Sequence, residues 1–212
     1  MEKKLLLLVS ICIFFNGIVL SQDAPLQGQL HGDFLIDAQY YLRDTAIDAD
    51  TIPETIGMNA YGNFNYTYGN FKAGIRLESY EATLLGFDQR YTGTGITYRY
   101  AQYTNDDLDI TVGNFYEQFG NGLVLRSYWE WYLGLDNNID GLKVHYKPMP
   151  GIHLKGIVGK QRFYFGLGPG LVRGLDAEFS LNEIFQNQIE SKTRVIIGGS
   201  AVSKYQEDRN SQ

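Results

Sequence analysis

The stretch "LHGDFLIDAQYYLR", residues 30–43, alternates between two kinds of residue at every step. One set is almost wholly apolar and consists of Leu30, Gly32, Phe34, Ile36, Ala38, Tyr40 and Leu42. The other set is mostly polar and consists of His31, Asp33, Leu35, Asp37, Gln39, Tyr41 and Arg43. Because successive side chains of a β-strand point to opposite faces, this period of two predicts a strand with one apolar and one polar face.

The same alternation continues almost to the end of the chain and predicts an all-β, antiparallel fold without a helix. Many of the segments between the alternating runs contain glycine, proline, asparagine or aspartate, which are typical of turns. The predicted strands are residues 30–43, 58–68, 71–80, 94–103, 108–116, 140–147, 152–161, 171–181 and 193–203, about nine in total.

Strand length separates the two architectures that fit this pattern, a soluble β-sandwich and a transmembrane β-barrel. A tilted strand needs about 9–11 residues to cross the hydrocarbon of a membrane, whereas strands of soluble proteins average about 5–6. Most of the predicted strands are close to ten residues long. This favours an up-and-down transmembrane β-barrel with its apolar face toward lipid and its polar face toward a lumen.

The lengths of the connections point the same way. The first, third, fifth and seventh are long and cover residues 44–57, 81–93, 117–139 and 162–170. The second, fourth and sixth are short turns, at residues 69–70, 105–107 and 148–151, and the eighth, "NEIFQNQIES", is an exception. Barrels of bacterial outer membranes have short periplasmic turns and longer external loops.

The N-terminus indicates the compartment of the protein, and the net charge limits the kinds of partner that it can bind. Residues 1–21 combine Lys3 and Lys4 with a long apolar run, which predicts a signal peptide cleaved before an outer-membrane domain at 22–212. The mature chain then has a net charge of −7 and no cysteine. An acidic chain of this kind argues against nucleic acid as a partner, and disulfides or thiolate chemistry are excluded.

The strand count predicts that the chain is an N-terminal part of a larger barrel. In an antiparallel barrel the number of strands is even, and a ninth strand would run parallel to the first. The chain also ends in "SKYQEDRNSQ" rather than in a strand with a terminal aromatic residue. A small barrel of eight strands with one extra segment is the alternative.

The sequence contains no catalytic, metal or cofactor signature, so we expect a protein that is not an enzyme. There is no metalloprotease, nucleophile-elbow or phosphate-loop motif, and His31, His145 and His153 stand on separate strands. "FGLGPGL" at 165–171 lacks the helix that a phosphate site needs. "TNDDLD" at 104–109 lacks full calcium-loop spacing and is expected to be an acidic turn.

The stretch "GNFYEQFGNGLVLRSYWEWYLGLDNN", residues 113–138, contains the strongest candidate for function. The connection at 117–139 is long enough that we expect it to be ordered or functional. One hypothesis is that it plugs the barrel, with Arg126, Glu130 and Asp136 pairing with lumen charges. The other is that Trp129 and Trp131 form a stacking platform for a sugar or peptide. The candidate residues are Glu117, Gln118, Arg126, Tyr128, Trp129, Glu130, Trp131, Asp136 and Asn137.

Two further sets of residues follow from the barrel prediction. Tyrosines near strand ends are expected in the headgroup layers: Tyr40, Tyr41, Tyr66, Tyr68, Tyr80, Tyr98, Tyr100, Tyr103 and Tyr116. Charges of both signs are expected on the lumen face, either in water or in ion pairs: Asp33, Asp37, Arg43, Lys72, Arg76, Glu78, Arg99, Lys143, Lys155, Arg173, Asp176 and Glu178.

The run "GNFYEQFGNGLVLRSY", followed by "LGLDNNIDGLKVHY" and "VRGLDAEFSLNEI", resembles a family of uncharacterised outer-membrane β-barrel proteins of Bacteroidota. The resemblance covers residues 28–203. The matching positions are Gly113, Asn114, Tyr116, Glu117, Gln118, Phe119, Gly120, Gly122, Leu123, Leu125, Arg126, Tyr128, Leu133, Gly134, Asp136 and Asn137.

This sequence departs from the family pattern at Trp129-Glu130-Trp131-Tyr132, where an acidic and basic pair is expected. The resemblance implies an outer-membrane location and a longer full-length protein, with no assigned activity or ligand.

Two functions therefore remain open. The first is an outer-membrane barrel for transport or as a scaffold for surface or secretion machinery. Its partners would be outer-membrane lipid, the barrel assembly machinery and either such proteins or small solutes. The second is a secreted soluble β-sandwich that binds glycans through Trp129 and Trp131.

Overall fold

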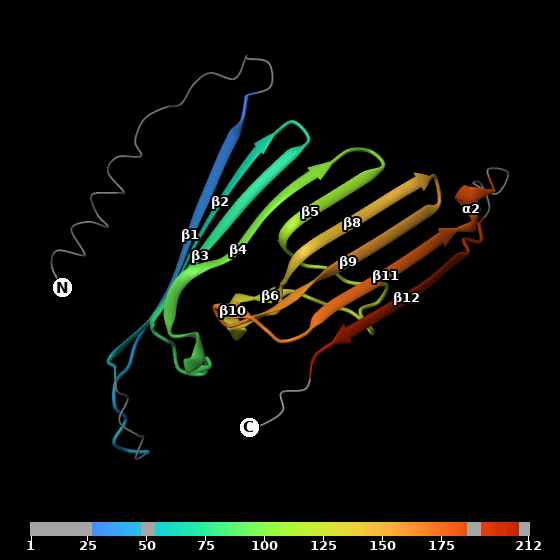
Figure 1. Cartoon of the computed structure of the whole chain (residues 1–212). Coiled ribbons are helices and arrows are strands. Elements are labelled where there is room, and N and C mark those ends of the chain that lie inside the picture. Colours follow the sequence, from blue (N-terminus) through green and yellow to red (C-terminus); the bar gives the residue numbers. More distant parts are fainter. Residues whose placement is uncertain (1–26, 48–53, 186–191, 208–212) are drawn as a thin grey trace.

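The computed structural model describes residues 27–47, 54–185 and 192–207, most of which belong to one curved antiparallel sheet (Figure 1). Each long strand pairs with its neighbours in the chain, so the sheet is up-and-down. The nine strands predicted from the period of two are thereby confirmed. They are β1 (Gln29–Tyr40), β2 (Ile56–Tyr68), β3 (Phe71–Ala82), β4 (Gly93–Thr104), β5 (Leu108–Phe115), β8 (Ile139–Met149), β9 (Ile152–Phe163), β11 (Leu171–Ser180) and β12 (Ile196–Tyr205).

The remaining elements are short and lie in the connections. β6 (Trp129–Glu130) and β7 (Leu135–Asp136) form a separate two-stranded sheet, and β10 (Gly166–Leu167) pairs with β9. The helical turns are η1 (Gln89–Tyr91), η2 (Trp131–Leu133) and α2 (Leu181–Ile184). The sequence predicted no helix, because elements of three or four residues are too short to show a period of 3.6. The predicted signal peptide, residues 1–21, lies outside the described residues.

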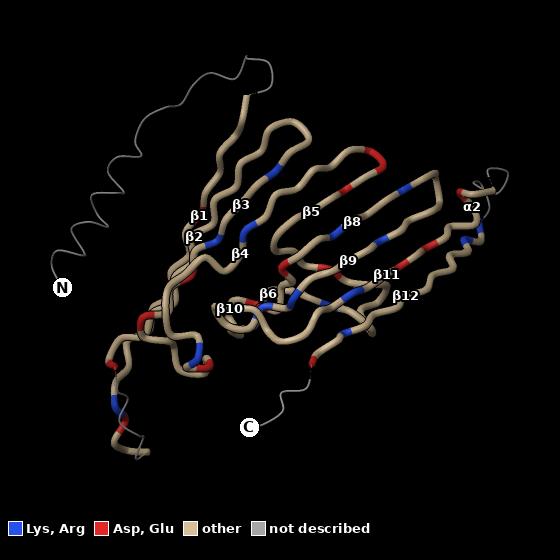
Figure 2. Tube along the Cα trace, in the orientation of Figure 1, with Lys and Arg blue, Asp and Glu red and all other residues tan. Residues whose placement is uncertain are grey.

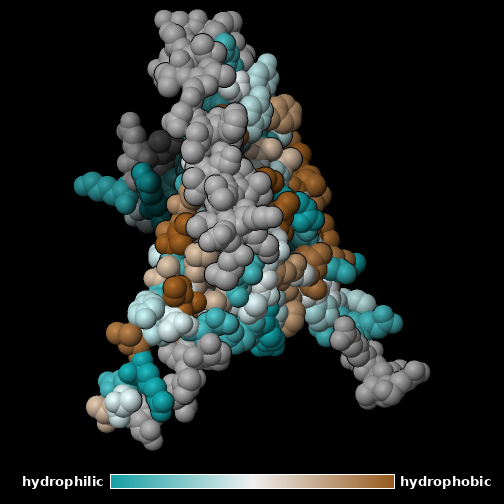
Figure 3. Space-filling model, turned by 90° about the vertical axis from the view of Figure 1, so that its left-hand side faces the viewer, coloured by the Kyte–Doolittle hydropathy of each residue, from teal (hydrophilic) through white to brown (hydrophobic). Residues whose placement is uncertain are grey.

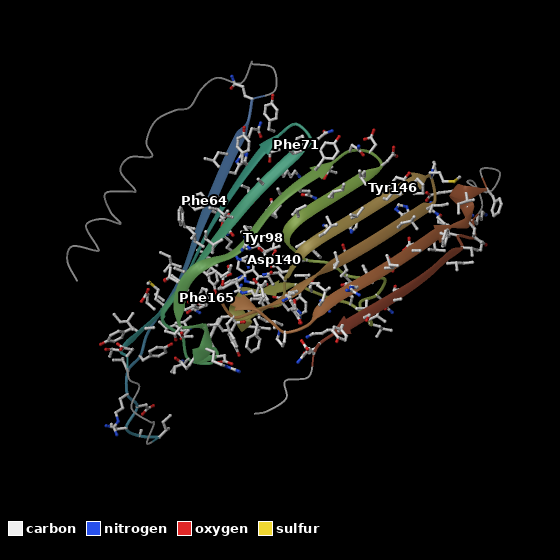
Figure 4. All side chains as sticks on the ribbon, in the orientation of Figure 1. Phe64, Phe71, Tyr98, Asp140, Tyr146 and Phe165 are labelled. Carbon is white, nitrogen blue, oxygen red and sulfur yellow. The ribbon has the colours of Figure 1, made fainter. Side chains whose placement is uncertain are left out.

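Apart from the connection at 181–195, long and short connections lie at opposite edges of the sheet (Figure 1). The connections at 83–92, 116–138 and 164–170 lie at the lower edge in the figure, as do the described parts of the connection between β1 and β2. The tight turns after β2, β4 and β8 lie at the upper edge, together with α2. In Figure 4, Phe71 and Tyr146 mark the short-turn edge, and Phe165 lies toward the long-connection edge.

The two faces of the sheet differ in the way the alternation predicts. On the outer face, Phe34 and Leu175 are more than two-thirds exposed, and Val112 is 58 % exposed. On the inner face, Arg76, Glu78 and Asp176 are buried. Apolar side chains also gather over the strands in Figure 3, whereas the lower end is mostly hydrophilic. The nine long strands form one continuous sheet, and the other sheet among the described residues is the two-stranded β6–β7 hairpin, which is much smaller than the second sheet of a sandwich.

The structure corrects the predicted face of two charged residues. The register shift at Arg76/Leu77 leaves Thr97 as an extra residue in β4, and Arg99 then lies on the outer face. There its guanidinium is 3.1 Å from a carboxylate oxygen of Asp140 on β8. Arg173 pairs with Val158 and is exposed on the same face. Alternation alone could not show this for Arg99, because a bulge inverts the phase of the residues beyond it.

Glycines allow close backbone approach where the sheet bends. Gly113, Gly141 and Gly159 lie side by side on β5, β8 and β9. A Cβ at Gly141 would lie 2.0 Å from the carbonyl oxygen of Val158, so no larger residue fits. Gly113 has φ 98° and is the last β5 residue paired with β4. Beyond it β4 diverges from β5, and the sheet opens toward the long-connection edge (Figure 1).

Within the described residues, β1 and β12 are the two ends of the sheet and do not pair with each other. The sheet is thus open. A small apolar core lies on its inner face where the connection after β5 packs, and it consists of Phe115, Phe119, Ile139, Ile157 and Val172.

Candidate functional site

The connection between β5 and β8, residues 116–138, folds back onto the inner face of the sheet, and we call it the inner segment. Its first part reverses at Gly120–Gly122 and is closed by backbone hydrogen bonds from Phe119 to Leu125 and from Ser127 to Glu117. Its second part is the β6–β7 hairpin, which turns through η2. The backbone N–H of Tyr128 donates to Oδ1 of Asn137 at 2.6 Å and joins the two parts. The prediction that this connection is ordered is confirmed.

Phe119 fixes the first part of the inner segment against the sheet. Its ring is 1 % exposed and packs over Gly174 of β11. A Cβ at Gly174 would lie 2.6 Å from Cε2 of Phe119, so the missing side chain makes room for the ring. Leu125 packs against the same core. Burial of apolar side chains of this size stabilises the docked segment by about 1.5–3 kcal/mol each.

The second part is held by a charge cluster of Arg76, Glu78, Asp136 and Arg162. Figure 2 marks the positions of all basic and acidic residues of the described chain along the backbone. Arg76 donates to Glu78 at 2.7 Å and also pairs with Asp136. Arg162 donates to Asp136 at 2.6 Å and to Glu78 at 2.7 Å. The four side chains are at most 5 % exposed. Because two positive and two negative charges alternate, none is left uncompensated in this buried place.

Aromatic side chains cover the charge cluster. The guanidinium of Arg76 lies 3.9 Å from the centroid of a Trp129 ring, a distance typical of a cation–π interaction. Tyr116 accepts a hydrogen bond from Arg76 at 3.1 Å and donates one to Asp136 at 3.0 Å. Burial, and then the charge of Asp136, raise the pKa of Tyr116, so its hydroxyl remains a donor. Tyr98, labelled in Figure 4, stacks on Tyr116 with centroids 5.2 Å apart.

Glu117 makes a second ionic contact, with β8 and β9. One carboxylate oxygen lies 2.5 Å from Nε2 of His145, and the other accepts from Nζ of Lys155 at 3.1 Å. Burial alone would raise the pKa of Glu117, but the hydrogen bond and charge of His145 and those of Lys155 outweigh it and lower the pKa to about 2. The carboxylate is therefore ionised at neutral pH.

Among the nine predicted site residues, the structure brings Glu117, Trp129 and Asp136 into contact with charged residues of the strands. Gln118 and Asn137 instead bond within the segment, through backbone groups of Gly120 and Arg126. These side-chain contacts shape the segment. The backbone oxygen of Gln118 also accepts from Nζ of Lys155 on β9 at 3.0 Å and so helps to attach the segment to the sheet.

The predicted ion pairs of Arg126 and Glu130 do not form among the described residues. Arg126 lies over the ring of Tyr128 at 4.8 Å. The two tryptophans of the predicted platform have different neighbours. Trp129 packs against Arg76 and Tyr61, whereas Trp131 packs against Tyr132 and is 36 % exposed. The platform for a sugar or peptide stays a prediction.

Sequence reasoning placed Arg76, Glu78 and Lys155 on the inner face but did not predict their partners. It missed Arg162, which lies at the end of β9 just where a loop was predicted to begin. It treated His145 as an isolated residue. The expectation that tyrosines mark the membrane boundary is wrong for Tyr98 and Tyr116, which stack on each other beside the charge cluster.

No group of three or more His, Cys, Asp or Glu side chains in the described residues could hold a metal ion. None of the described helices is long and apolar enough to cross a membrane.

Comparison with protein families matches residues 1–212 to a family of unknown function, DUF6029. The chain belongs to this family. No curated protein matched it.

Proposed function

We propose that the chain forms the wall of an outer-membrane β-barrel and that the inner segment closes its lumen. The observation that carries this proposal is the distribution of polarity across the sheet. An antiparallel sheet in water buries its apolar face. Here large apolar side chains are exposed on the outer face, and charged side chains are buried on the inner face. Such an arrangement suits a sheet with lipid outside and polar groups inside.

Strand length and connection length support the same proposal. Eight of the nine long strands have 10–13 residues, which is sufficient to cross the hydrocarbon of a membrane when tilted. The connections at 83–92, 116–138 and 164–170 share one edge, as the external loops of outer-membrane barrels do, whereas the connection at 181–195 lies at the other edge. The resemblance of residues 113–138 to outer-membrane proteins of Bacteroidota adds to this support. In lipid, β1 and β12 need backbone partners, so closure of the wall is part of the proposal.

The inner segment suits a plug because it is attached by side chains from several strands. β3 and β9 supply the charge cluster, and β8 and β9 supply the partners of Glu117. Its apolar side chains pack on the wall at Phe119 and Leu125. The lumen is then closed in the resting state. The barrel assembly machinery inserts the protein, which then serves solute transport or supports surface or secretion proteins.

Two measurements test this proposal. First, the protein expressed with its own N-terminus should fractionate with outer membranes and migrate differently in detergent before and after heating. Quantitative recovery from the soluble periplasm would refute the barrel. Second, the protein in planar bilayers should conduct little, and a variant with residues 118–135 replaced by a short Gly-Ser linker should conduct strongly. A variant with the turn at 105–107 replaced is the matched control, and equal conductance of all three would refute the plug.

A further inference from the structure

The contact partners of Glu117 belong to a row of basic side chains that we call the basic strip, Lys143, His145 and Lys155. Lys143 and His145 are two residues apart on β8 and so point to the same face. Lys155 lies directly opposite His145 on β9. Two basic groups directly opposite each other on neighbouring strands repel when both are charged. This wall therefore favours an anion between them.

Glu117 supplies that anion in the described structure. Its two carboxylate oxygens are divided between His145 and Lys155, at 2.5 and 3.1 Å. Glu117 belongs to the inner segment and not to the wall, so this contact is broken whenever that part of the segment moves. The wall acids directly opposite these two basic residues do not form ion pairs with them in the described structure. Asp109 is opposite His145 but accepts from Gln102 at 2.6 Å, and Asp176 is opposite Lys155 but accepts from Ser200 at 2.5 Å.

A cavity at the Lys143 end of the basic strip provides room for a solute. It has a volume of about 370 Å³ and is lined by Lys143 together with Tyr100, Gln102, Thr111 and Tyr116, the neighbour of Glu117 in the chain. Lys143 has no hydrogen bond or ion pair with any other described residue. Arg76 of the charge cluster lines it as well. The lining thus combines the unpaired Lys143 and the ion-paired Arg76 with aromatic faces and neutral hydrogen-bonding groups, a combination that suits a small ligand with one anionic group and several hydroxyls.

We propose that the basic strip binds the carboxylate of a sugar acid and that Glu117 occupies this site in the closed state. The ligand carboxylate displaces Glu117 from His145 and Lys155, its hydroxyls bond to the cavity lining, and the first part of the inner segment is released. The charge cluster at Asp136 is untouched by this exchange, so the second part stays attached. This inference rests on the proposed function, because it assigns a ligand to the lumen that the inner segment closes.

Isothermal titration calorimetry provides the test, because it registers ligand binding directly. The full chain in detergent is titrated with sodium glucuronate at constant ionic strength, with glucose as the uncharged control. We expect a saturable heat of binding with glucuronate and none with glucose. An equal response to both sugars, or no saturable response to glucuronate, would overturn the proposal.

Three variants sharpen the test. Lys143→Met should weaken glucuronate binding about tenfold, the loss expected for one hydrogen bond to a charged group. Lys72→Met, which removes another inner-face lysine from β3, is the matched control and should bind as the wild type does. Glu117→Gln should bind about tenfold more tightly in calorimetry, because the internal competitor is gone. Unchanged affinity in both Lys143→Met and Glu117→Gln would contradict the proposal.

The result is independent of the test of the plug. If removal of residues 118–135 leaves conductance unchanged, the closing role fails, whereas the calorimetric affinities of Lys143→Met and Glu117→Gln still decide whether the basic strip is an anion site.

Discussion

The inner segment is attached to the sheet through two ionic contacts that differ in charge balance and exposure. The charge cluster around Asp136 contains two arginines and two carboxylates that are all buried. The contact of Glu117 joins one carboxylate to His145 and Lys155, whose side chains are 29 % and 28 % exposed. The first contact is balanced and shielded from water. The second has excess basic groups and is accessible, so the two ends of one segment are held with different strength.

Asp136→Asn should have the largest effect, because it leaves Arg76 and Arg162 with only Glu78 for compensation. Removal of one partner from a buried ionic network costs about 3–5 kcal/mol. We expect a loss of this size in the free energy of unfolding, measured by denaturant titration in detergent. Asp88→Asn removes a carboxylate from the exposed pair with Arg90 and is the control. If both variants lose the same small amount, the cluster does not stabilise the segment.

Gly174→Val should have the next largest effect, because its side chain would occupy the place of the Phe119 ring. Overpacking of this kind costs about 1–3 kcal/mol, and the inner segment should be displaced with a change in tryptophan emission. Gly199→Ala, where a Cβ has no atom within 4 Å, is the control and should leave emission unchanged. A double variant with Gly174→Ala and Phe119→Leu should lose less stability than Gly174→Val. If Gly174→Val and the Gly199→Ala control do not differ in stability or emission, the docking geometry is contradicted.

The Glu117 contact should be revealed by its pH dependence. The pKa of Glu117 is lowered to about 2 from an ordinary value of 4.5, so its ionised form stabilises the folded state above pH 4.5. This stabilisation should be lost as the pH falls from 4.5 toward 2. In Glu117→Gln that part of the pH dependence should disappear from the unfolding free energy. If the unfolding free energies of the wild type and of Glu117→Gln change in parallel over this pH range, the contact contributes nothing to the stability.

The smallest effect is expected for Arg126→Gln. This variant tests whether the segment is held by its specific ion pairs or by its total charge. Arg126 forms no ion pair with a described residue and only lies over Tyr128. An exposed interaction of this type contributes about 0.5–1 kcal/mol. Chemical denaturation should therefore show a change well below that of Asp136→Asn. A loss as large as that of Asp136→Asn would mean that the segment is held by its total charge and not by the two contacts.

The strands were predictable because one physical requirement, a polar and an apolar face, is repeated at every second residue of each strand. The order of the inner segment was predictable from its length and from side chains such as Leu125 and Trp129, which are too apolar to remain in water. The partners were not predictable. Asp136 and Arg76 are 60 residues apart, and their contact depends on how the sheet curves and opens beyond Gly113. Arg162 gave no signal, since a charge at a strand end usually faces solvent.

The ends of the inner segment determine what a change in its length would do to the sheet. β5 and β8 pair directly, and the last pair, Phe115 and Ile139, lies at the two points where the segment leaves and rejoins the sheet. The wall is therefore continuous without the segment, and the cost of closing a loop grows only slowly with its length. A longer, shorter or different insertion between Phe115 and Ile139 would therefore leave the register of the strands unchanged.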